Sequence, residues 1–574
     1  MPFDGVLAKC IANELNDELT QGRIEKVFMP EKLELVFSIR TRVGNCKLLI
    51  NVNPSFARVH LTTMKKENPN TPPMFCMLLR KHLTGGRILS VTSQEFERVI
   101  IFEIESANEL GDLSVKKIVV EIMGKHSNVV LLNSQSIIID SLIHVDSDMS
   151  SKREIMPARN YEIPPSQGKV SIDMFEEIDF KKLTDESEEK LEKILLNSIQ
   201  GFSPSLAKEI CVRSEFKVEN FPLVLNQIRL EIKEDRLFPA VYFSDSNEEN
   251  LVDFHCIKLT HKQSFLKQDS INHALDYYFN RKIFIEKLAQ SKLSLVKIVS
   301  SNQDRCVKKL SLQQKSVEDS RNFDFNRMIG DILNANINSI PKGAKKVDLP
   351  NFYSEAEENI SIEIDDQLSP QRNAQKYYTK YSKAKKTFEH STAQVGETIL
   401  ELEYLETIEE EISRSKTFVE LSDIREELVS QKYISPPKIK GKKREEIESP
   451  PEEYISSDGF KIFSGKNNRQ NDLLTLKSSK GDDVWFHTQK IPGSHVIIRT
   501  AGKNVPARTL EEAATISAWH SRARNSTKVP VDYTFVRNVR KPHGAKPGMV
   551  IYDTFKTMFV SPDENIVKKL MVTR

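Results

Sequence analysis

The sequence predicts a multidomain α+β protein of 574 residues. Hydrophobic residues make up 39% of the chain, so it can bury cores, but it is too long to form a single core. Short β-rich runs dominate its first part, and two long stretches rich in Lys, Glu, Gln and Leu follow. We expect an N-terminal antiparallel-sheet domain at 1–170, a helix-hairpin-helix unit with a helical connector at 171–265, a long antiparallel coiled-coil arm with a middle insert at 266–433, a flexible linker at 434–453 and a C-terminal basic α+β domain at 454–574.

The first domain combines strands with two helices. Runs of apolar and β-branched residues predict strands at 33–39, 99–104, 118–122 and 129–132. Helices are predicted at 6–19 and 73–83. This mixture predicts an α+β domain built on an antiparallel sheet. Residues 156–165 end in paired prolines and are predicted to form the linker that leaves the domain.

A helical hairpin is predicted around residue 200. A turn with Gly201 precedes Ser203, which suits a helix N-cap, and Pro204, which suits the first helical position. Ala207 is small enough for close packing. Such hairpins often present backbone N–H groups to a phosphate, because a helix N-terminus carries partial positive charge. An ordinary αα-hairpin used only for packing is the alternative.

Two long helices are predicted at 271–315 and 394–431. In the second, apolar residues keep a spacing typical of a coiled coil: Leu405, Ile408, Ile412 and Val419. In the first they form a looser stripe: Leu288, Leu295, Val299 and Cys306. Two such helices separated by other residues predict an antiparallel arm.

Between these helices, residues 371–386 are basic and interleaved with tyrosines. Aromatic rings can stack on bases while ammonium groups meet phosphates, so Lys380, Lys383 and Lys385 are candidate RNA contacts. The alternative is a solvated helical face whose tyrosines pack inward.

The net charge of +2 hides an uneven distribution. Residues 454–574 contain 20 Lys and Arg against 10 Asp and Glu, a net charge of +10, which leaves −8 for residues 1–453. Clustered positive charge indicates a polyanion binder, since each neutralised phosphate releases condensed counterions. A basic surface that is only solvated is the alternative.

Other features argue against secretion and catalysis. No apolar run is long enough to cross a bilayer and the N-terminus lacks a secretory signal, so we expect a cytoplasmic protein without membrane contact. The six cysteines lie far apart, and we expect reduced, mostly buried thiols. His487 and His495 have no further metal ligand at a helpful spacing and are interpreted as hydrogen-bonded or RNA-facing side chains. We expect no metal, no cofactor and no catalytic residues.

Several segments resemble signatures of one family. They are residues 1–5, 72–81, 123–128, 373–375, 482–487, 492–495, 528–533 and 541–548. In this order, and over essentially the whole chain, they resemble the NFACT family, and in particular its bacterial ribosome quality-control factors.

The resemblance implies a function. Such proteins bind stalled large (50S) ribosomal subunits that still carry peptidyl-tRNA, recruit alanyl-tRNA and support template-free C-terminal alanine tailing, which marks the nascent chain for degradation. The ribosome makes the peptide bonds, so the protein would be a binding and elongation factor rather than an enzyme. The resemblance assigns tRNA handling to residues 1–170 and nucleic-acid contact to 454–574.

The resemblance also implies binding residues. The family's Asp-Arg pair corresponds to Glu97 and Arg98, with Glu in place of Asp, and we assign tRNA contact to this pair together with Lys125 and His126. Candidate rRNA contacts in the arm and the basic domain are Lys380, Lys383, Lys385, Lys466, Arg469, His487, His495, Lys541 and Lys546.

Arg98 lies in a segment, 96–104, that is predicted to be a strand. On a strand, Arg98 shares one face with Phe96 and Ile100, so a guanidinium stands at the edge of an apolar stripe. A salt bridge at the rim, with the aliphatic stem packed along the stripe, is the structural alternative to tRNA contact.

Two other functions stay open. The N-terminal domain with a helical hairpin resembles bifunctional formamidopyrimidine glycosylases, in which the amine of Pro2 would form a Schiff base with an abasic sugar. Phe3 replaces the acid expected after that proline, and no C-terminal zinc finger is found. The other is a surface adhesin that binds fibronectin, as an older family name suggests, although the absent signal argues against it.

Overall fold

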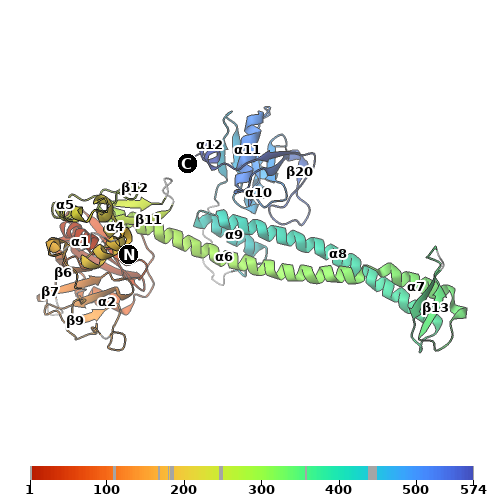
Figure 1. Cartoon of the computed structure of the whole chain (residues 1–574), viewed down its shortest axis with the longest axis horizontal. Coiled ribbons are helices and arrows are strands. Elements are labelled where there is room, and N and C mark those ends of the chain that lie inside the picture. The colour runs from red at the N-terminus through yellow and green to blue at the C-terminus, as the bar shows by residue number, and fades with distance from the viewer. Residues whose placement is uncertain are drawn as a thin grey trace. The chain divides into compact units, whose positions relative to one another are not determined.

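The structure is a computed structural model that describes residues 3–107, 111–150, 152–165, 168–178, 180, 187–244, 250–355, 358–436 and 449–572. It divides into two compact units, Met1–Ile285 and Glu286–Arg574. The predicted multidomain α+β class is confirmed, with a large antiparallel sheet, long helices and a C-terminal sheet domain (Figure 1). None of the helices in these ranges is both long and apolar enough to span a membrane.

A nine-stranded antiparallel sheet forms the centre of the first unit, in the order β4-β3-β2-β1-β5-β6-β7-β8-β9. Its strands are β1 (Arg23–Glu31), β2 (Glu34–Arg40), β3 (Asn45–Asn51), β4 (Arg58–Leu61), β5 (Arg87–Ser93), β6 (Val99–Ala107), β7 (Leu113–Glu121), β8 (Asn128–Leu132) and β9 (Ile138–Ser141). The helices α1 (Gly5–Leu19) and α2 (Met74–Leu83) share the core on one face, which Ile100 and Phe102 of β6 join. Val99 faces the smaller core on the other side, as the two-residue period of a strand requires. The predicted strands and helices of this domain are confirmed.

The start of the strand predicted at 96–104 is wrong. β6 begins at Val99, and Phe96 lies in a preceding turn with a φ of 59°. Arg98 therefore precedes the strand and does not belong to its apolar stripe. Its carbonyl accepts a hydrogen bond from the N–H of Ile122 at 2.8 Å, which ties the turn to the end of β7.

A helical part and a small sheet, β11-β10-β12, complete the first unit. Their elements, with the short turn after β7, are η1 (Gly124–His126), η2 (Ile172–Glu177), α3 (Glu188–Ser198), α4 (Pro204–Arg213), η4 (Val218–Asn220), α5 (Phe221–Lys233), β10 (Ala240–Phe243), β11 (Leu251–His255) and β12 (Ser264–Lys267). Ser203 caps α4 by accepting from the N–H of Leu206 at 3.3 Å, and Pro204 takes the first helical position, as predicted. The predicted linker at 156–165 lies along β9, since the N–H of Ile138 donates to the carbonyl of Arg159 at 2.8 Å.

The long helix α6 (Ile271–Ser320) begins in the first unit, where carboxylates hold its first turns. Glu14 accepts from the N–H groups of Ile271 and Asn272 at 2.8 and 2.9 Å. Asp276 accepts from the hydroxyl of Thr62 at 2.6 Å. The first N–H groups of a helix have no partner within it, so Glu14 satisfies them and fixes the start of α6 against α1.

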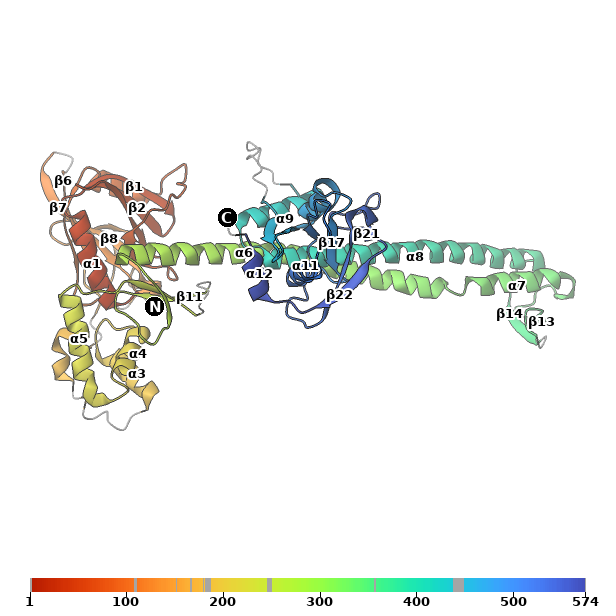
Figure 2. The ribbon, with the colours of Figure 1, turned by 90° about the horizontal axis from the view of Figure 1, so that it is seen from above.

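In the second unit α6 lies side by side with α8 (Pro370–Arg414), and Figure 2 shows the pair from above. The helices are antiparallel: Gln313 accepts from the hydroxyl of Thr398 at 2.9 Å, and Gln303 donates to Glu409 at 3.2 Å. The apolar seam contains Leu295, Val299, Cys306, Leu405, Ile408 and Ile412. At the far end of the pair lie α7 (Phe323–Ala335), η5 (Ile337–Ser339), β13 (Lys346–Pro350) and β14 (Asn359–Glu363).

Two details of the predicted arm are wrong. Residues 371–386 do not separate the two long helices but form the first part of α8. The second helix ends at Arg414, and a capping box at Thr417 starts a separate helix, α9 (Phe418–Ser430). Val419 is therefore outside the seam and is 41% exposed.

The C-terminal sheet has the order β15-β16-β18-β17-β19-β22. Its elements are β15 (Glu452–Ile455), β16 (Lys461–Ser464), α10 (Asn468–Asp472), η6 (Leu473–Ser478), β17 (Val484–Thr488), β18 (Val496–Ile498), α11 (Ala507–Trp519), β19 (Val529–Phe535), η7 (Val536–Asn538), β20 (Val539–Arg540), β21 (Ile551–Tyr552), β22 (Lys556–Val560) and α12 (Glu564–Leu570). α11 and α12 share the core on one face of the sheet. Most of the predicted linker at 434–453, namely 437–448, lies outside the described residues.

Two glutamates are buried where α8 and α9 meet α10. Glu427 is fully buried and accepts from the hydroxyl of Tyr404 at 2.7 Å and from the side chain of Asn468 at 3.2 Å. Glu411 is 2% exposed. Burial and the negative charge of Glu427 raise the pKa of Glu411 well above its usual value, against the opposing attraction of Arg414. The folded protein therefore favours the protonated form of Glu411.

We predict that Glu411→Gln stabilises the protein at neutral pH. In the unfolded chain Glu411 releases its proton above its ordinary pKa of 4.5, whereas in the folded protein it keeps the proton to higher pH. The free energy of unfolding therefore falls as the pH rises from 4.5 toward the raised pKa of Glu411. Glutamine cannot ionise, so the variant should melt about 2 °C or more above the wild type at neutral pH. The difference in melting temperature between the variant and the wild type should vanish near the ordinary pKa of glutamate. Melting curves over a pH series measure this.

Glu318→Gln is the matched control, since the Glu318 side chain is 73% exposed and should melt like the wild type. A Glu411→Gln variant that melts lower than the wild type at neutral pH would show that an ionised Glu411 stabilises the fold through Arg414.

Candidate functional site

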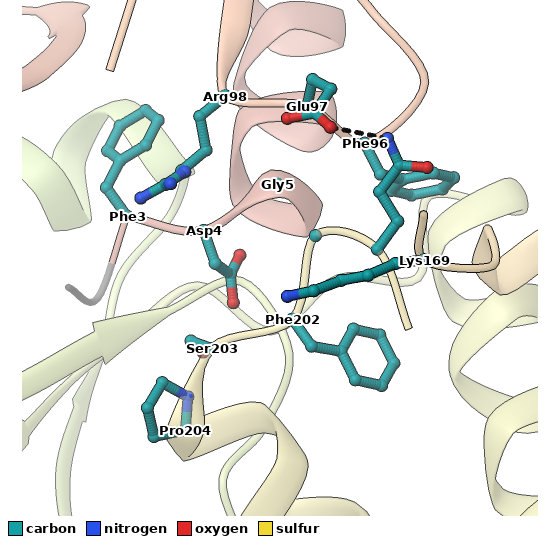
Figure 3. Close-up of a pocket in the computed structure, with 12 residues that line it drawn as sticks. Phe3, Asp4, Gly5, Phe96, Glu97, Arg98, Lys169, Phe202, Ser203 and Pro204 are labelled. Atoms are coloured by element: carbon teal, nitrogen blue, oxygen red, sulfur yellow. Dashed lines mark hydrogen bonds between the residues drawn. The ribbon is translucent and has the colours of Figure 1, made fainter. Parts of the chain in front are cut away.

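Three segments that are distant in the sequence enclose a small pocket in the first unit (Figure 3). They are the start of α1, the turn before β6, and the turn that leads into α4. The pocket has a volume of about 170 Å³ and is lined by residues 3–5, 96–98, 169 and 200–204. It brings Glu97 and Arg98 next to the predicted helical hairpin.

Two glycines bring these segments together. The N–H of Gly5 donates to the carbonyl of Gly201 at 2.9 Å. A Cβ on Gly5 would lie 1.6 Å from the carbonyl oxygen of Phe96, and one on Gly201 would lie 2.7 Å from the same atom. Gly201 also has a φ of +80°, which other residues adopt only with strain. No side chain fits at either position, so both glycines are required for this contact.

Asp4 fixes the start of α1 and is itself neutralised. It is 4% exposed, accepts from the N–H of Leu7 at 2.8 Å and lies 3.1 Å from the Nε2 of His255 on β11. Burial opposes its ionisation, but the charge and hydrogen bond of His255 outweigh burial, so the pKa of Asp4 is lowered. Burial alone would lower the pKa of His255. The charge and hydrogen bond of Asp4 outweigh burial, so the pKa of His255 is raised. The two form a buried ion pair that supports the pocket from behind.

Glu97 is held by the hairpin turn. The side-chain amide of Gln200 donates to its Oε1 at 2.9 Å, the bond drawn in Figure 3. This contact joins the turn before β6 to the turn before α4. It orients the carboxylate at the rim of the pocket.

Arg98 and Lys169 supply positive charge. Figure 3 shows both side chains reaching into the pocket, Arg98 beside Phe3 and Lys169 from the opposite wall. Lys169 donates to the carbonyl of Leu196 at 3.0 Å. Within the described ranges the guanidinium of Arg98 makes no hydrogen bond or ion pair, so the salt bridge considered as its alternative role is not found there.

The start of α4 adds to this positive field. Ser203 and Pro204 line the pocket at the N-terminus of a ten-residue helix, whose aligned peptide dipoles place partial positive charge there. Asp4 is already paired, so the lining groups without an ionic partner are two cations, a helix N-terminus and the carboxylate of Glu97 at the rim. This combination favours an anionic ligand such as a phosphate, and the rings of Phe3, Phe96 and Phe202 add apolar walls.

The other predicted tRNA contacts lie near the pocket but do not line it. Lys125 and His126 are exposed on η1, shortly after Ile122, whose N–H bonds to the carbonyl of Arg98. Sequence reasoning missed Lys169 and Gln200. Nothing in the local sequence singles them out, since their role arises only from the contact of distant turns.

The predicted arm contacts are exposed, but their tyrosines are not free. Lys380, Lys383 and Lys385 are exposed on α8, and the first two line a groove of about 450 Å³ between α6, α7 and α8. The hydroxyl of Tyr378 donates to Asp331 at 2.6 Å, and that of Tyr377 donates to the carbonyl of Glu363 at 2.7 Å. This matches the alternative in which the tyrosines pack inward. The three lysines stay exposed, and the Nζ of Lys380 lies 4.7 Å from the ring centre of Tyr377.

Most of the predicted contacts in the basic domain already have partners within the chain, and their assignment to RNA stays a prediction. Lys466 pairs with Glu420 of α9 at 2.9 Å, and Arg469 with Glu426 at 3.5 Å. The Nζ of Lys546 lies 4.6 Å from the ring centres of both Tyr404 and Tyr433. These three cations hold the domain against α8 and α9. Lys541 pairs with Asp472 inside the domain.

Of the two predicted histidines, His495 is buried, and the RNA contact of His487 stays a prediction. His495 is 2% exposed and bonds to the hydroxyl of Thr475 at 2.8 Å. Burial lowers its pKa well below the usual value, so it is neutral and does not face RNA. His487 is half-buried with its ring 5.8 Å from that of Trp485.

Among the described residues no group of three or more His, Cys, Asp or Glu is arranged to hold a metal ion. Pro2, which the glycosylase alternative requires, lies outside the described residues.

We predict that Gly201→Ala lowers the free energy of unfolding by about 1–3 kcal/mol, because a Cβ there must either strain the backbone or push against Phe96. Gly343→Ala is the matched control: its φ of +79° is nearly the same, but nothing lies within 4 Å of the added Cβ. Urea titration of both variants separates crowding from backbone strain. Equal losses in the two variants would show that the contact with Phe96 contributes nothing.

Comparison with known proteins agrees with this organisation. A family model described as NFACT N-terminal and middle domains matches residues 4–446, and a model of the NFACT protein RNA binding domain matches 452–553. The chain is 38% identical to the Rqc2 homolog RqcH of Bacillus subtilis (strain 168), over 99% of this chain and 100% of the relative. It is 33% identical to the Rqc2 homolog RqcH of Streptococcus suis (strain 05ZYH33), over 100% of both. The solved structure of the fibrinogen binding protein from Staphylococcus aureus is 32% identical and covers 48% of this chain and 98% of its own, with a TM-score of 0.42. The chain therefore belongs to the NFACT family.

Proposed function

We propose that this protein acts in ribosome-associated quality control in the cytoplasm. It binds a stalled large ribosomal subunit that carries peptidyl-tRNA, recruits alanyl-tRNA and supports template-free alanine tailing of the nascent chain. Peptide-bond formation is left to the ribosome. The similarity to two Rqc2 homologs along their whole length and the match to an RNA binding domain support this role.

The geometric observation that carries the tRNA part of the proposal is the pocket at Glu97 and Arg98. Arg98, Lys169 and the start of α4 converge on about 170 Å³, enough for a phosphate group of a larger RNA. Arg98 offers a planar fork that matches phosphate oxygens or base edges. Glu97, oriented by Gln200, accepts from a ribose hydroxyl or an exocyclic amine. Lys125 and His126, exposed at the same end of the sheet, contact the RNA beyond the pocket.

The arm supplies the proposed contact with the subunit. Lys380, Lys383 and Lys385 are exposed along one stretch of α8, and Lys315 of α6 lines the same groove as the first two. Such a row neutralises phosphates without reading bases, which suits binding to ribosomal RNA.

We predict that Arg98→Ala reduces the tRNA content of purified subunit complexes about tenfold or more, because a charge-assisted hydrogen bond is lost. Binding to large subunits should stay near wild type. Alanine tails on a stalled reporter should shorten in parallel, and Lys169→Ala should act in the same direction. The measurements are sequencing of bound tRNA, cosedimentation and tail length.

Arg42→Ala is the control, since Arg42 is an exposed arginine of the same unit that does not line the pocket. Normal tRNA content and tail length with Arg98→Ala would mean that Arg98 is structural and that the pocket does not bind tRNA. Lost subunit binding with normal tRNA binding would place the ribosome contact at this pocket instead.

A second prediction concerns the arm. Changing Lys380, Lys383 and Lys385 together to Glu should weaken cosedimentation with large subunits and leave the melting temperature unchanged, since all three are exposed. If each contacts one phosphate, the slope of log affinity against log salt should fall by about 2–3. The control changes three exposed lysines of α6, Lys297, Lys308 and Lys309, to Glu. Equal weakening in both triple variants would show that only net charge matters.

A further inference from the structure

The last strand of the C-terminal sheet lies outside the part that the RNA-binding family model matches. That match ends at residue 553, whereas β22 spans Lys556–Val560. β22 is an edge strand paired only with β19 in the described structure. Met558 and Val560 face the core with α11, while Phe559, on the other side, is 68% exposed. A phenylalanine this exposed on a sheet edge has no role in the core.

Two rows of paired residues on β17, β19 and β22 place polar groups around Phe559. Pro530 pairs with Phe559, and the N–H of Gln489 donates to the carbonyl of Pro530 at 2.9 Å. In the next row Asp532 pairs with His487 on one side and with Thr557 on the other. Side chains of both rows lie on one face of the sheet, because strand residues two apart point the same way.

Asp532 holds these polar groups in place. Its carboxylate is 1% exposed and accepts from the hydroxyl of Thr557 at 2.6 Å, from that of Tyr552 at 2.8 Å and from the amide of Gln489 at 3.2 Å. The charge of Asp532 is thus buried and satisfied. The amide oxygen of Gln489 is left to accept from a ligand.

Two lysines flank this face at the end where Phe559 lies. Lys490 follows β17 and Lys528 precedes β19, and the strand pairing places both next to the row of Pro530 and Phe559. Both are exposed, and neither makes an ion pair or hydrogen bond with any residue that the structure describes. They differ in this from Lys466, Arg469 and Lys546, whose charges contact α8 and α9. The positive charge left for a ligand includes this end of the sheet.

We propose that this surface, formed by Gln489, Lys490, Lys528, Thr557 and Phe559, binds single-stranded RNA. An unpaired base stacks on Phe559, its edge bonds to Gln489 and Thr557, and the adjoining phosphates meet Lys490 and Lys528. The positive charge beside the exposed ring argues for RNA over a protein strand. Bases in a duplex are covered by their neighbours and cannot stack on Phe559, so the ligand is unpaired. The inference rests on the RNA binding in the proposed function and specifies its chemistry.

The test uses the full-length chain and free oligonucleotides, so its outcome does not depend on whether the chain binds ribosomes or tRNA. Fluorescence anisotropy compares an unstructured RNA of about 10 nucleotides with a duplex of equal length at several salt concentrations. Phe559→Ala should weaken single-strand binding about 5- to 100-fold with an unchanged salt slope, because stacking is lost but no charge is. Phe559→Trp should restore binding. Lys490→Ala with Lys528→Ala should flatten the salt slope by about 1.4, at roughly 0.7 per phosphate on single strands.

Phe352→Ala is the matched control, since Phe352 is 53% exposed outside the C-terminal sheet and should leave binding unchanged. The proposal is overturned if Phe559→Ala binds single strands like the wild type, or if it loses duplex and single-strand binding equally. It is also overturned if RNA binding is unchanged and Phe559→Ala instead loses a copurifying protein, because the edge would then accept a protein strand.

Discussion

At Gly5 and Gly201 two stretches of main chain approach so closely that the Phe96 carbonyl leaves no room for a side chain on either. This contact determines the positions of three segments that are far apart in the sequence. The start of α1, the turn before β6 and the turn before α4 can meet only there, and the pocket is the space they enclose. The unusual φ of Phe96 belongs to the same constraint, since an extended strand at that point would not present its carbonyl to both glycines.

Pairing of charges then decides what each surface can bind. In the pocket Asp4 is neutralised by His255, so Arg98 and Lys169 face one remaining carboxylate among the lining residues, that of Glu97 at the rim. In the second unit the same reasoning applies to the candidate rRNA contacts. Lys466 and Arg469 are close to glutamates of α9, and an RNA phosphate would have to displace those carboxylates first. The net charge of the domain includes these two side chains, but in the structure each is paired with a carboxylate of the same chain.

The sequence was sufficient for most of the fold but for only part of the site. The predicted strands of the N-terminal domain were confirmed, and Ser203 was recognised as a cap because capping is local, whereas the second long helix was predicted at 394–431 and spans Pro370–Arg414. The turn at Phe96 was missed, because its residues also suit a strand and the carbonyl that requires the turn contacts glycines about 100 residues away. Lys169 and Gln200 were missed for the same reason. The burial of His495 was not predicted, since it depends on helix η6 covering that face of the sheet.

Glu97 stands where the resemblance to the NFACT family implies an aspartate. Glutamate carries one more methylene than aspartate, so without a restraint its carboxylate would reach further and sample more positions. Gln200 donates to it at 2.9 Å from the turn that Gly201 holds in place. This hydrogen bond across the rim holds the carboxylate, which makes no ion pair with Arg98 in the part of the chain that the structure describes. The guanidinium therefore remains available to a ligand, which a direct salt bridge between the two residues would prevent.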